Sequence, residues 1–246
     1  MDHEGLNGVT FPSGEYTLRG VFYMARGDEP KPTALLLHGC PGFEKNLDIA
    51  YALRERGWNS LVFHYRGCWG SDGAYVFRTI PDDVSAAIDH LTSGQYACVD
   101  PQRLVAIGHS LGGWAATLAT ARDKRLRGAA IYGAAVELGR SVSRQIVENE
   151  IAPWVNASAD ELVAQRAELG DEHRPLAQVS RIAPRPLLIV HGDADPYIPA
   201  EHAQLLYDHA GEPRELAIVP GANHSFAWHR RELIDMLWAW LQRCEL

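Results

Sequence analysis

Short apolar segments that alternate with helical patterns constrain the fold of this chain more than any other feature of its sequence. The predicted strands are residues 16–24, 33–38, 59–65, 103–107, 128–133, 186–191 and 214–219. Most of them are continuous apolar runs, which are typical of strands buried on both faces of a parallel sheet. Apolar stripes at helical spacing predict helices at 81–93 and 227–243. This order indicates an α/β fold in which helices cover both faces of a mostly parallel sheet.

Residues 137–182 interrupt this alternation, because they separate two predicted strands by far more chain than one crossover helix requires. Within them, 141–152 and 158–169 are expected to be helical, the second with Ser158 as its N-cap. Excursions this long are usually functional. We therefore expect residues 1–246 to form a single domain in which 137–182 form a short helical lid or cap. Extra helical packing on one face of the sheet is the alternative.

A Gly-His-Ser-Leu-Gly motif at 108–112 lies between the predicted strand at 103–107 and a helical stretch. The pattern alone recurs by chance, but a sharp strand-to-helix turn is the context in which it exposes a strained serine for nucleophilic attack. Ser110 would then lie at the carboxyl end of a central strand, where open α/β sheets bind their ligands. Ser110 is therefore the candidate nucleophile.

A seryl hydroxyl needs a base, and the base needs an orienting carboxylate. Asp193 and Asp195 follow the strand at 186–191, and His224 follows the final strand at 214–219. Both groups thus come after the serine in the chain and lie at strand ends, in the order Ser, acid, His. Spacing alone leaves both carboxylates open as the acid.

From about residue 16 to its end, the chain resembles the α/β-hydrolase superfamily. Its motifs are most similar to those of feruloyl-esterase-like, dienelactone-hydrolase-like and prolyl-oligopeptidase-type serine hydrolases. In that group the acid lies in a His-Gly-x-x-Asp-x-x-Val/Ile-Pro pattern, which runs here from His191 to Pro199. The resemblance therefore implies that Asp195 is the acid and that Asp193 forms a turn.

The same resemblance implies an oxyanion hole made of two backbone N–H groups. One belongs to Leu111, directly after the nucleophile, and the other to Cys40 in the loop at 35–46. His38 is expected to bond this loop's backbone. A thiol at position 40 departs from the usual aliphatic or aromatic residue, and Cys40 as a nucleophile is a remote alternative because it has no adjacent base in the sequence.

The segment at 64–73 resembles the superfamily's Tyr-Arg-Gly-x-Gly-x-Ser loop. Arg66 and Asp72 are expected to brace this loop rather than to touch substrate. Trp69 departs from the small residue or histidine often found there and is a tentative wall of the substrate pocket. Ile151 and Trp154, in the insertion, are further tentative pocket residues, with plain packing as the alternative.

Composition excludes several classes of protein. A formal net charge of −8 argues against nucleic acid or an anionic membrane as a partner. Four scattered cysteines predict free thiols, and the absence of a signal peptide or a long apolar run predicts a cytoplasmic protein without a membrane span. No metal-binding spacing or dinucleotide fingerprint occurs, so we expect neither a metal nor another cofactor. The sequence does not indicate an oligomeric state.

The expected function is that of a serine carboxylesterase that hydrolyses small to medium acyl or aryl esters through an acyl-enzyme. An aminopeptidase or acyl-peptide-type amidase on the same triad is the alternative, and Glu148, Glu150 or Asp160 could then anchor a free amine. A non-catalytic ligand-binding protein of the same fold is a remote alternative. Dienelactone hydrolysis usually requires a cysteine nucleophile, and position 110 is serine.

Overall fold

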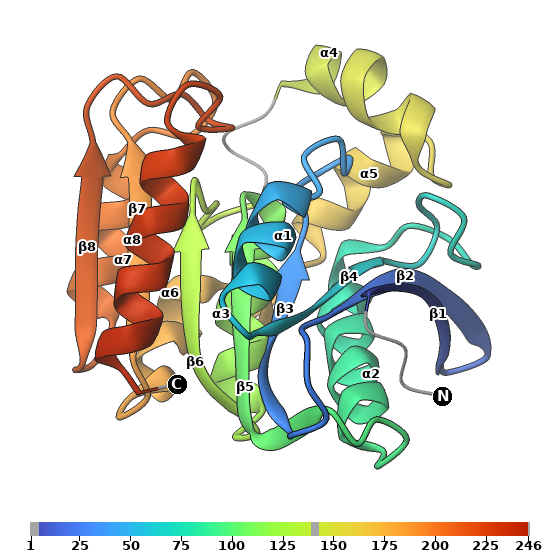
Figure 1. The fold of residues 1–246 in the computed structure, drawn as a ribbon. Helices are drawn as coiled ribbons and strands as arrows, with labels where there is room; N and C mark the ends of the chain where they lie inside the picture. Colours follow the sequence, from blue (N-terminus) through green and yellow to red (C-terminus); the bar gives the residue numbers. More distant parts are fainter. Residues whose placement is uncertain (1–4, 139–142, 246) are drawn as a thin grey trace.

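The computed structural model describes residues 5–138 and 143–245, and in this part of the chain eight strands form one sheet (Figure 1). The strand order is β1-β2-β4-β3-β5-β6-β7-β8. β2 pairs antiparallel with β1 and β4, whereas the pairings from β4 through β3 to β8 are parallel. The predicted α/β class with a mostly parallel sheet is therefore confirmed.

The strands are β1 (Gly5–Ser13), β2 (Tyr16–Met24), β3 (Lys31–Leu37), β4 (Asn59–His64), β5 (Val99–His109), β6 (Leu126–Tyr132), β7 (Leu187–Gly192) and β8 (Arg214–Val219). The longer helices are α1 (Leu47–Glu55), α2 (Ile80–Thr92), α3 (Leu111–Arg122), α5 (Ala159–Ala167), α7 (Glu201–His209) and α8 (Arg230–Arg243). Two short helices, α4 (Arg144–Ile146) and α6 (Pro175–Gln178), lie in the segment between β6 and β7.

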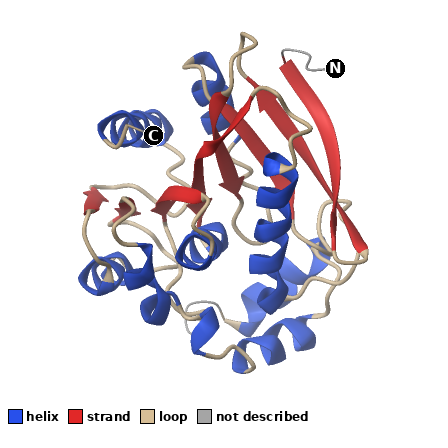
Figure 2. Ribbon diagram, turned by 90° about the horizontal axis from the view of Figure 1, so that it is seen from below, coloured by secondary structure: helices blue, strands red, loops and turns tan. Residues whose placement is uncertain are grey.

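Helices cover both faces of the sheet, as expected (Figure 2). Because successive strand residues point to opposite faces, Leu35 and Leu37 of β3 pack on the side of α2 and α3, and Leu36 packs on the side of α1 and α8. Every residue of β3 is buried. This double burial is the physical reason for its continuous apolar run.

All seven predicted strands are present, and the structure adds β1. Its sequence, GLNGVTFPS, contains two glycines and a proline, which weaken an intrinsic strand signal. β1 forms the edge of the sheet and pairs along its whole length with β2. Proline is tolerated on an edge strand, so tertiary pairing rather than local preference makes this segment a strand.

Within residues 143–182, α4 lies at the side of the molecule toward which the parallel strands point, whereas α6 lies farther back along the sheet, in contact with α3 (Figure 1). The predicted helix at 158–169 is α5, and Ser158 caps it together with Glu161 in a capping box. Of the predicted helix at 141–152, residues 141 and 142 lie outside the described residues. The remainder forms α4, a π-helical turn at Val147–Ile151 and the start of a 3₁₀ turn at Ala152–Trp154.

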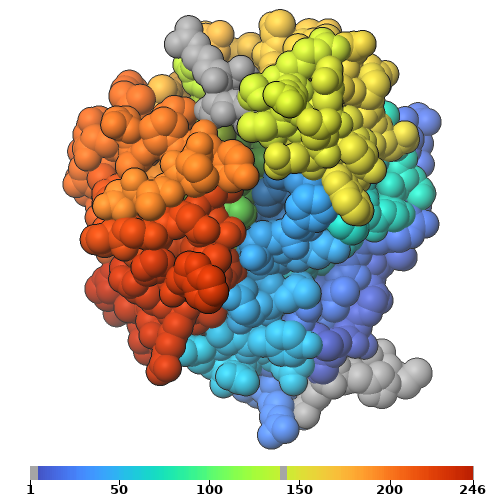
Figure 3. Space-filling view, turned by 90° about the horizontal axis from the view of Figure 1, so that it is seen from above, coloured from blue at the N-terminus to red at the C-terminus, as the bar shows by residue number. Residues whose placement is uncertain are grey.

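The middle of this segment is hydrogen-bonded to the loop between β4 and α2. The Asn156 N–H donates to the Gly67 carbonyl at 2.6 Å, and the Tyr75 N–H donates to the Asn156 carbonyl at 3.0 Å. Gln165 of α5 bonds the backbone of Tyr75 and Phe77. Figure 3 shows the insertion, in yellow, beside the blue loop between β3 and α1. This part of the insertion thus lies beside the carboxyl ends of the strands. The role of the insertion as a lid is still a prediction.

Candidate active site

Ser110 occupies a strained turn between β5 and α3. Its φ of 54° and ψ of −118° are unusual for a residue other than glycine. A Cβ at Gly112 would lie 1.9 Å from the Leu37 carbonyl oxygen, and one at Gly108 would lie 2.1 Å from the Gly112 carbonyl oxygen. Both flanking positions of the motif therefore require glycine, and the strand-to-helix turn expected for it is present.

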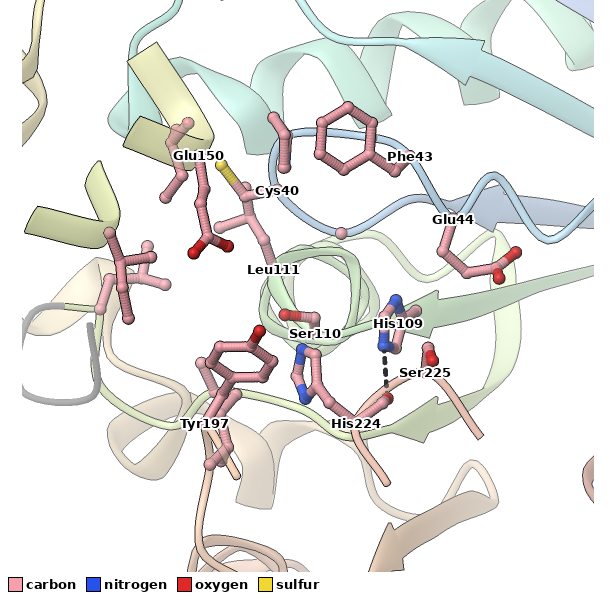
Figure 4. Close-up of a pocket in the computed structure, with 18 of the residues that line it drawn as sticks. Cys40, Phe43, Glu44, His109, Ser110, Leu111, Glu150, Tyr197, His224 and Ser225 are labelled. Carbon is pink, nitrogen blue, oxygen red and sulfur yellow. Dashed lines mark hydrogen bonds between the residues drawn. The ribbon is translucent and has the colours of Figure 1, made fainter. Parts of the chain in front are cut away.

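His224, in the loop after β8, lies beside Ser110 in Figure 4. Its Nδ1 is 2.7 Å from Oδ2 of Asp195, which follows β7. A carboxylate accepts here, so Nδ1 carries the proton and Nε2 is left as the acceptor that a general base needs. The loops after three different strands thus bring Ser110, His224 and Asp195 together at the carboxyl ends of the parallel strands.

The surroundings of Asp195 keep it ionised. Its side chain is only 1% exposed, and burial by itself raises the pKa of the carboxyl group. Hydrogen bonds from His191 and His224 outweigh burial and hold this pKa well below its ordinary value. The backbone N–H groups of Tyr197 and Ile198 also donate to Oδ1, at 2.8 and 3.0 Å. Asp195 is therefore an anion that is held firmly against His224.

Asp193 has a different position. Its Oδ1 accepts the backbone N–H of Gly221 at 2.6 Å, and its side chain is exposed. This bond links the loop after β7 to the loop after β8, so Asp193 ties two loops together, whereas it was expected to bond the backbone of its own turn. Of the two carboxylates in this loop, the structure brings Asp195 to His224.

Cys40 and Leu111 line the same cavity as Ser110. Leu111 is the first residue of α3, where backbone N–H groups have no acceptor within the helix. Among the described residues, the Cys40 N–H has no acceptor either. Burial raises the pKa of the Cys40 thiol to about 11, so it is protonated near neutral pH and unsuited to nucleophilic attack. Both backbone groups are available to an oxyanion.

The cavity has a volume of about 250 Å³, and most of its lining is apolar. Ile151 from the insertion lines it, as tentatively expected, but Trp69 and Trp154 do not. Trp69 donates its Nε1–H to the Pro41 carbonyl at 2.6 Å and stacks on Trp154 with ring centroids 5.9 Å apart. The two indoles pack on each other instead of on the cavity, so their assignment to the cavity wall is corrected.

Phe43 connects this indole pair to the cavity and was missed from the sequence. Its ring lines the cavity and meets Trp154 edge to face, with centroids 5.0 Å apart. Tyr197 and Arg166 are further lining residues that were missed. Tyr197 lies two positions after Asp195, which is a usable signal, whereas nothing in the sequence places Arg166 of α5 here.

The three acidic residues considered as amine anchors separate in the structure. Glu148 and Asp160 both pair with Arg144, at 2.6 and 2.5 Å. Glu150 instead lines the cavity, and Figure 4 shows its carboxylate pointing into the space that Ser110 faces. Only Glu150 among these three could contact a bound substrate.

The residues expected to brace the neighbouring loops do make such contacts. Arg66 Nε lies 2.5 Å from Oδ1 of the fully buried Asp83, and Asp72 pairs with Arg19 at 2.8 Å. His38 Nδ1 donates to the Gly39 carbonyl at 2.7 Å. None of these side chains lines the cavity.

Residues 5–138 and 143–245 contain neither a cluster of metal ligands nor a bilayer-spanning helix. Nowhere in these ranges do three or more His, Cys, Asp or Glu side chains form a group that could hold a metal ion. No helix in these ranges is long and apolar enough to span a bilayer.

Comparisons with known proteins agree with this architecture. The model of the prolyl oligopeptidase family matches residues 48–245. The uncharacterized protein YfhR of Escherichia coli K12 is 29% identical over 218 residues, which cover 85% of this chain and 71% of the relative.

Solved structures resemble the whole chain. The α/β hydrolase GrgF from Penicillium sp. sh18 superposes with a TM-score of 0.82 at 20% identity, covering 97% of this chain and 98% of that one. Est1E from Butyrivibrio proteoclasticus, in a structure with ferulic acid bound, gives a TM-score of 0.78 at 19% identity, covering 96% and 98%. These likenesses confirm the α/β-hydrolase fold.

Proposed function

This chain belongs to the prolyl oligopeptidase family of α/β hydrolases, and from that membership we propose that it is a serine esterase. The observation that carries the proposal is the position of the strained Ser110 turn beside the His224–Asp195 pair, whose Nδ1 and Oδ2 are 2.7 Å apart. A serine, a correctly protonated histidine and an anionic orienting group are the parts that acyl transfer requires.

In the first step, Ser110 Oγ attacks the ester carbonyl carbon while His224 Nε2 accepts the hydroxyl proton. The imidazolium that forms is stabilised by the buried carboxylate of Asp195. Negative charge develops on the carbonyl oxygen, and the N–H groups of Leu111 and Cys40 are the donors proposed to stabilise it. Collapse of this intermediate expels the alcohol, which takes the proton back from His224, and leaves an acyl-serine.

In the second step, His224 removes a proton from water as the water oxygen attacks the acyl carbon. The bond between this carbon and Ser110 Oγ then breaks, His224 returns the proton to Oγ, and the acid is released. No cofactor takes part in either step.

The size and lining of the cavity support small to medium acyl or aryl groups. About 250 Å³ lies slightly below the volume of typical drug-sized ligand sites. Phe77, Leu111, Ile146 and Ile151 provide apolar walls. An ester of this kind, rather than a long acyl chain, is the substrate class that we propose.

The direct test is the Ser110→Ala variant with p-nitrophenyl acetate and butyrate as substrates. We expect the wild type to hydrolyse both and the variant to lose this activity, while its thermal unfolding stays close to that of the wild type. A variant with near wild-type rates would refute the assignment of Ser110. Failure of a fluorophosphonate probe to label the wild type would instead favour a non-catalytic ligand-binding protein.

Aminoacyl-amide hydrolysis is the second candidate, and the Glu150 carboxylate in the cavity favours it. A carboxylate in this cavity would stabilise a substrate ammonium group. Matched substrates separate the two candidates, because alanyl and propionyl groups differ mainly in one amine. Higher kcat/KM for alanine p-nitroanilide than for the propionyl amide of p-nitroaniline, lost in Glu150→Gln, would support the amidase. Hydrolysis of p-nitrophenyl propionate with no preference for the alanyl anilide over the propionyl anilide would support the esterase.

A further inference from the structure

His109, the residue before the proposed nucleophile, connects the loops that carry the catalytic groups. It is the last residue of β5, is only 4% exposed, and lines the cavity. Its Nε2 lies 2.8 Å from the backbone carbonyl oxygen of His224, a bond drawn as a dashed line in Figure 4. A residue of the nucleophile turn thus holds the main chain of the candidate base.

The contact determines the tautomer of His109. A carbonyl oxygen can only accept, so Nε2 carries the proton and Nδ1 is a bare acceptor. Nδ1 is buried and has no hydrogen-bond partner among the described residues. A Cβ at Gly39 would lie 3.1 Å from this nitrogen, so the oxyanion loop passes directly over it. In the other neutral tautomer, the Nδ1–H donor would have no acceptor among the described residues, and the Nε2 lone pair would face the His224 carbonyl oxygen.

The surroundings of His109 also keep it uncharged. Burial lowers its pKa to about 3, and the charges of His224 and Arg230 act in the same direction, against the opposing effects of the hydrogen bond to the His224 carbonyl and of the Asp195 charge. Its ring stacks on Tyr132 at the end of β6, with centroids 4.8 Å apart. The His224 ring lies at the same centroid distance. A cation at this position would oppose the imidazolium that forms on His224 during acyl transfer.

We propose that His109 is a positioning residue that fixes the backbone of His224, so that the imidazole is held over Ser110 from two sides. Asp195 anchors the ring through Nδ1, and His109 anchors the main chain of the same residue. Histidine suits this role because it combines a donor, an uncharged ring and a flat surface for Tyr132. The inference rests on the proposed function, since its value lies in aligning the base with the nucleophile.

Two substitutions test the role against mere packing. His109→Phe keeps a ring that can stack on Tyr132 but removes the donor. His109→Gln places an amide N–H near the position of Nε2. Because misplacement of a catalytic group by about 1 Å can cost on the order of 100-fold in rate, we expect His109→Phe to lower kcat for p-nitrophenyl butyrate by about 10- to 100-fold with little change in KM. His109→Gln should recover most of that loss. Equal kcat for His109→Phe and wild type, or equal loss in both variants, would overturn the proposal.

Imidazole nitrogen NMR gives a readout that does not depend on activity. In the ¹⁵N-labelled full chain, His109 should remain the neutral Nε2–H tautomer from pH 5 to pH 9. The His224 imidazole signals should shift or broaden in His109→Phe and return toward wild type in His109→Gln. Titration of His109 in this range, or unchanged His224 signals in His109→Phe, would contradict the positioning role. If wild-type activity does not depend on Ser110, the proposed function fails, and these spectra still decide the role of His109.

Discussion

Asp195→Asn changes one atom of the candidate triad, and the structure indicates how the site would respond. Oδ1 of Asp195 accepts two backbone N–H groups, from Tyr197 and Ile198, while Oδ2 faces His224. The asparagine oxygen would therefore stay at the Oδ1 position, since reversing the amide would oppose its NH₂ to two backbone N–H donors. Each unsatisfied donor costs about 1–3 kcal/mol. The asparagine NH₂ would then point at His224 Nδ1.

This orientation inverts the tautomer of the base. His224 would have to accept at Nδ1 and carry its proton on Nε2, so it could no longer take the proton of Ser110. Inversion of this kind in a serine protease triad lowers kcat about 10⁴-fold, which corresponds to about 5.4 kcal/mol of transition-state stabilisation. We expect a loss of this size for Asp195→Asn.

The assay is kcat for p-nitrophenyl butyrate, with thermal unfolding to show that each variant is folded. Asp193→Asn is the matched control, because an asparagine oxygen can still accept the Gly221 N–H that Asp193 bonds. It should stay within about twofold of wild type. The reasoning is refuted if Asp195→Asn keeps more than about a tenth of wild-type kcat, or if Asp193→Asn loses as much activity.

Three further predictions concern the oxyanion loop, a buried ion pair and acid stability. Cys40→Ala should keep kcat within a few-fold of wild type, because the proposed donor is a backbone N–H; complete loss in a folded variant, measured with p-nitrophenyl butyrate, would contradict this. Asp83→Ala should lower the free energy of unfolding in urea by about 3–5 kcal/mol, because Arg66 would lose its buried partner; a change below about 1 kcal/mol would show that the pair contributes little. Burial lowers the pKa of His38 to about 4 and the pKa values of His64 and His109 to about 3, so the unfolded chain binds protons first below pH 6.5. Each should lower the free energy of unfolding by about 1.4 kcal/mol per pH unit as the pH falls from 6.5 toward the folded pKa; urea unfolding at pH 7 and pH 5 would measure this, and His109→Phe should lose less stability over this range than the wild type.

The sequence alone determined the central sheet and the nucleophile turn. Strands β3, β4, β6 and β7 are recognisable because burial on both faces requires apolar residues at successive positions, which leaves a continuous signal. The Gly108 requirement is local, because a Cβ there would clash with the Gly112 carbonyl in the same turn, whereas Gly112 is required by the close approach of Leu37 from strand β3. Edge strand β1 had no such signal, because only its pairing with β2 makes it a strand.

Only the tertiary structure decided which side chains surround Ser110. The sequence suggested both Trp69 and Trp154 as residues of the cavity wall. In the structure they stack on each other, and Phe43 lines the cavity. Glu148 and Glu150 are two positions apart, and one pairs with Arg144 while the other points toward the serine. The sequence indicated where the strands end, because backbone pairing and burial are regular along each strand and leave a local pattern of residues. The cavity joins segments far apart in the chain, so the direction of each of its side chains depends on packing that no local pattern encodes.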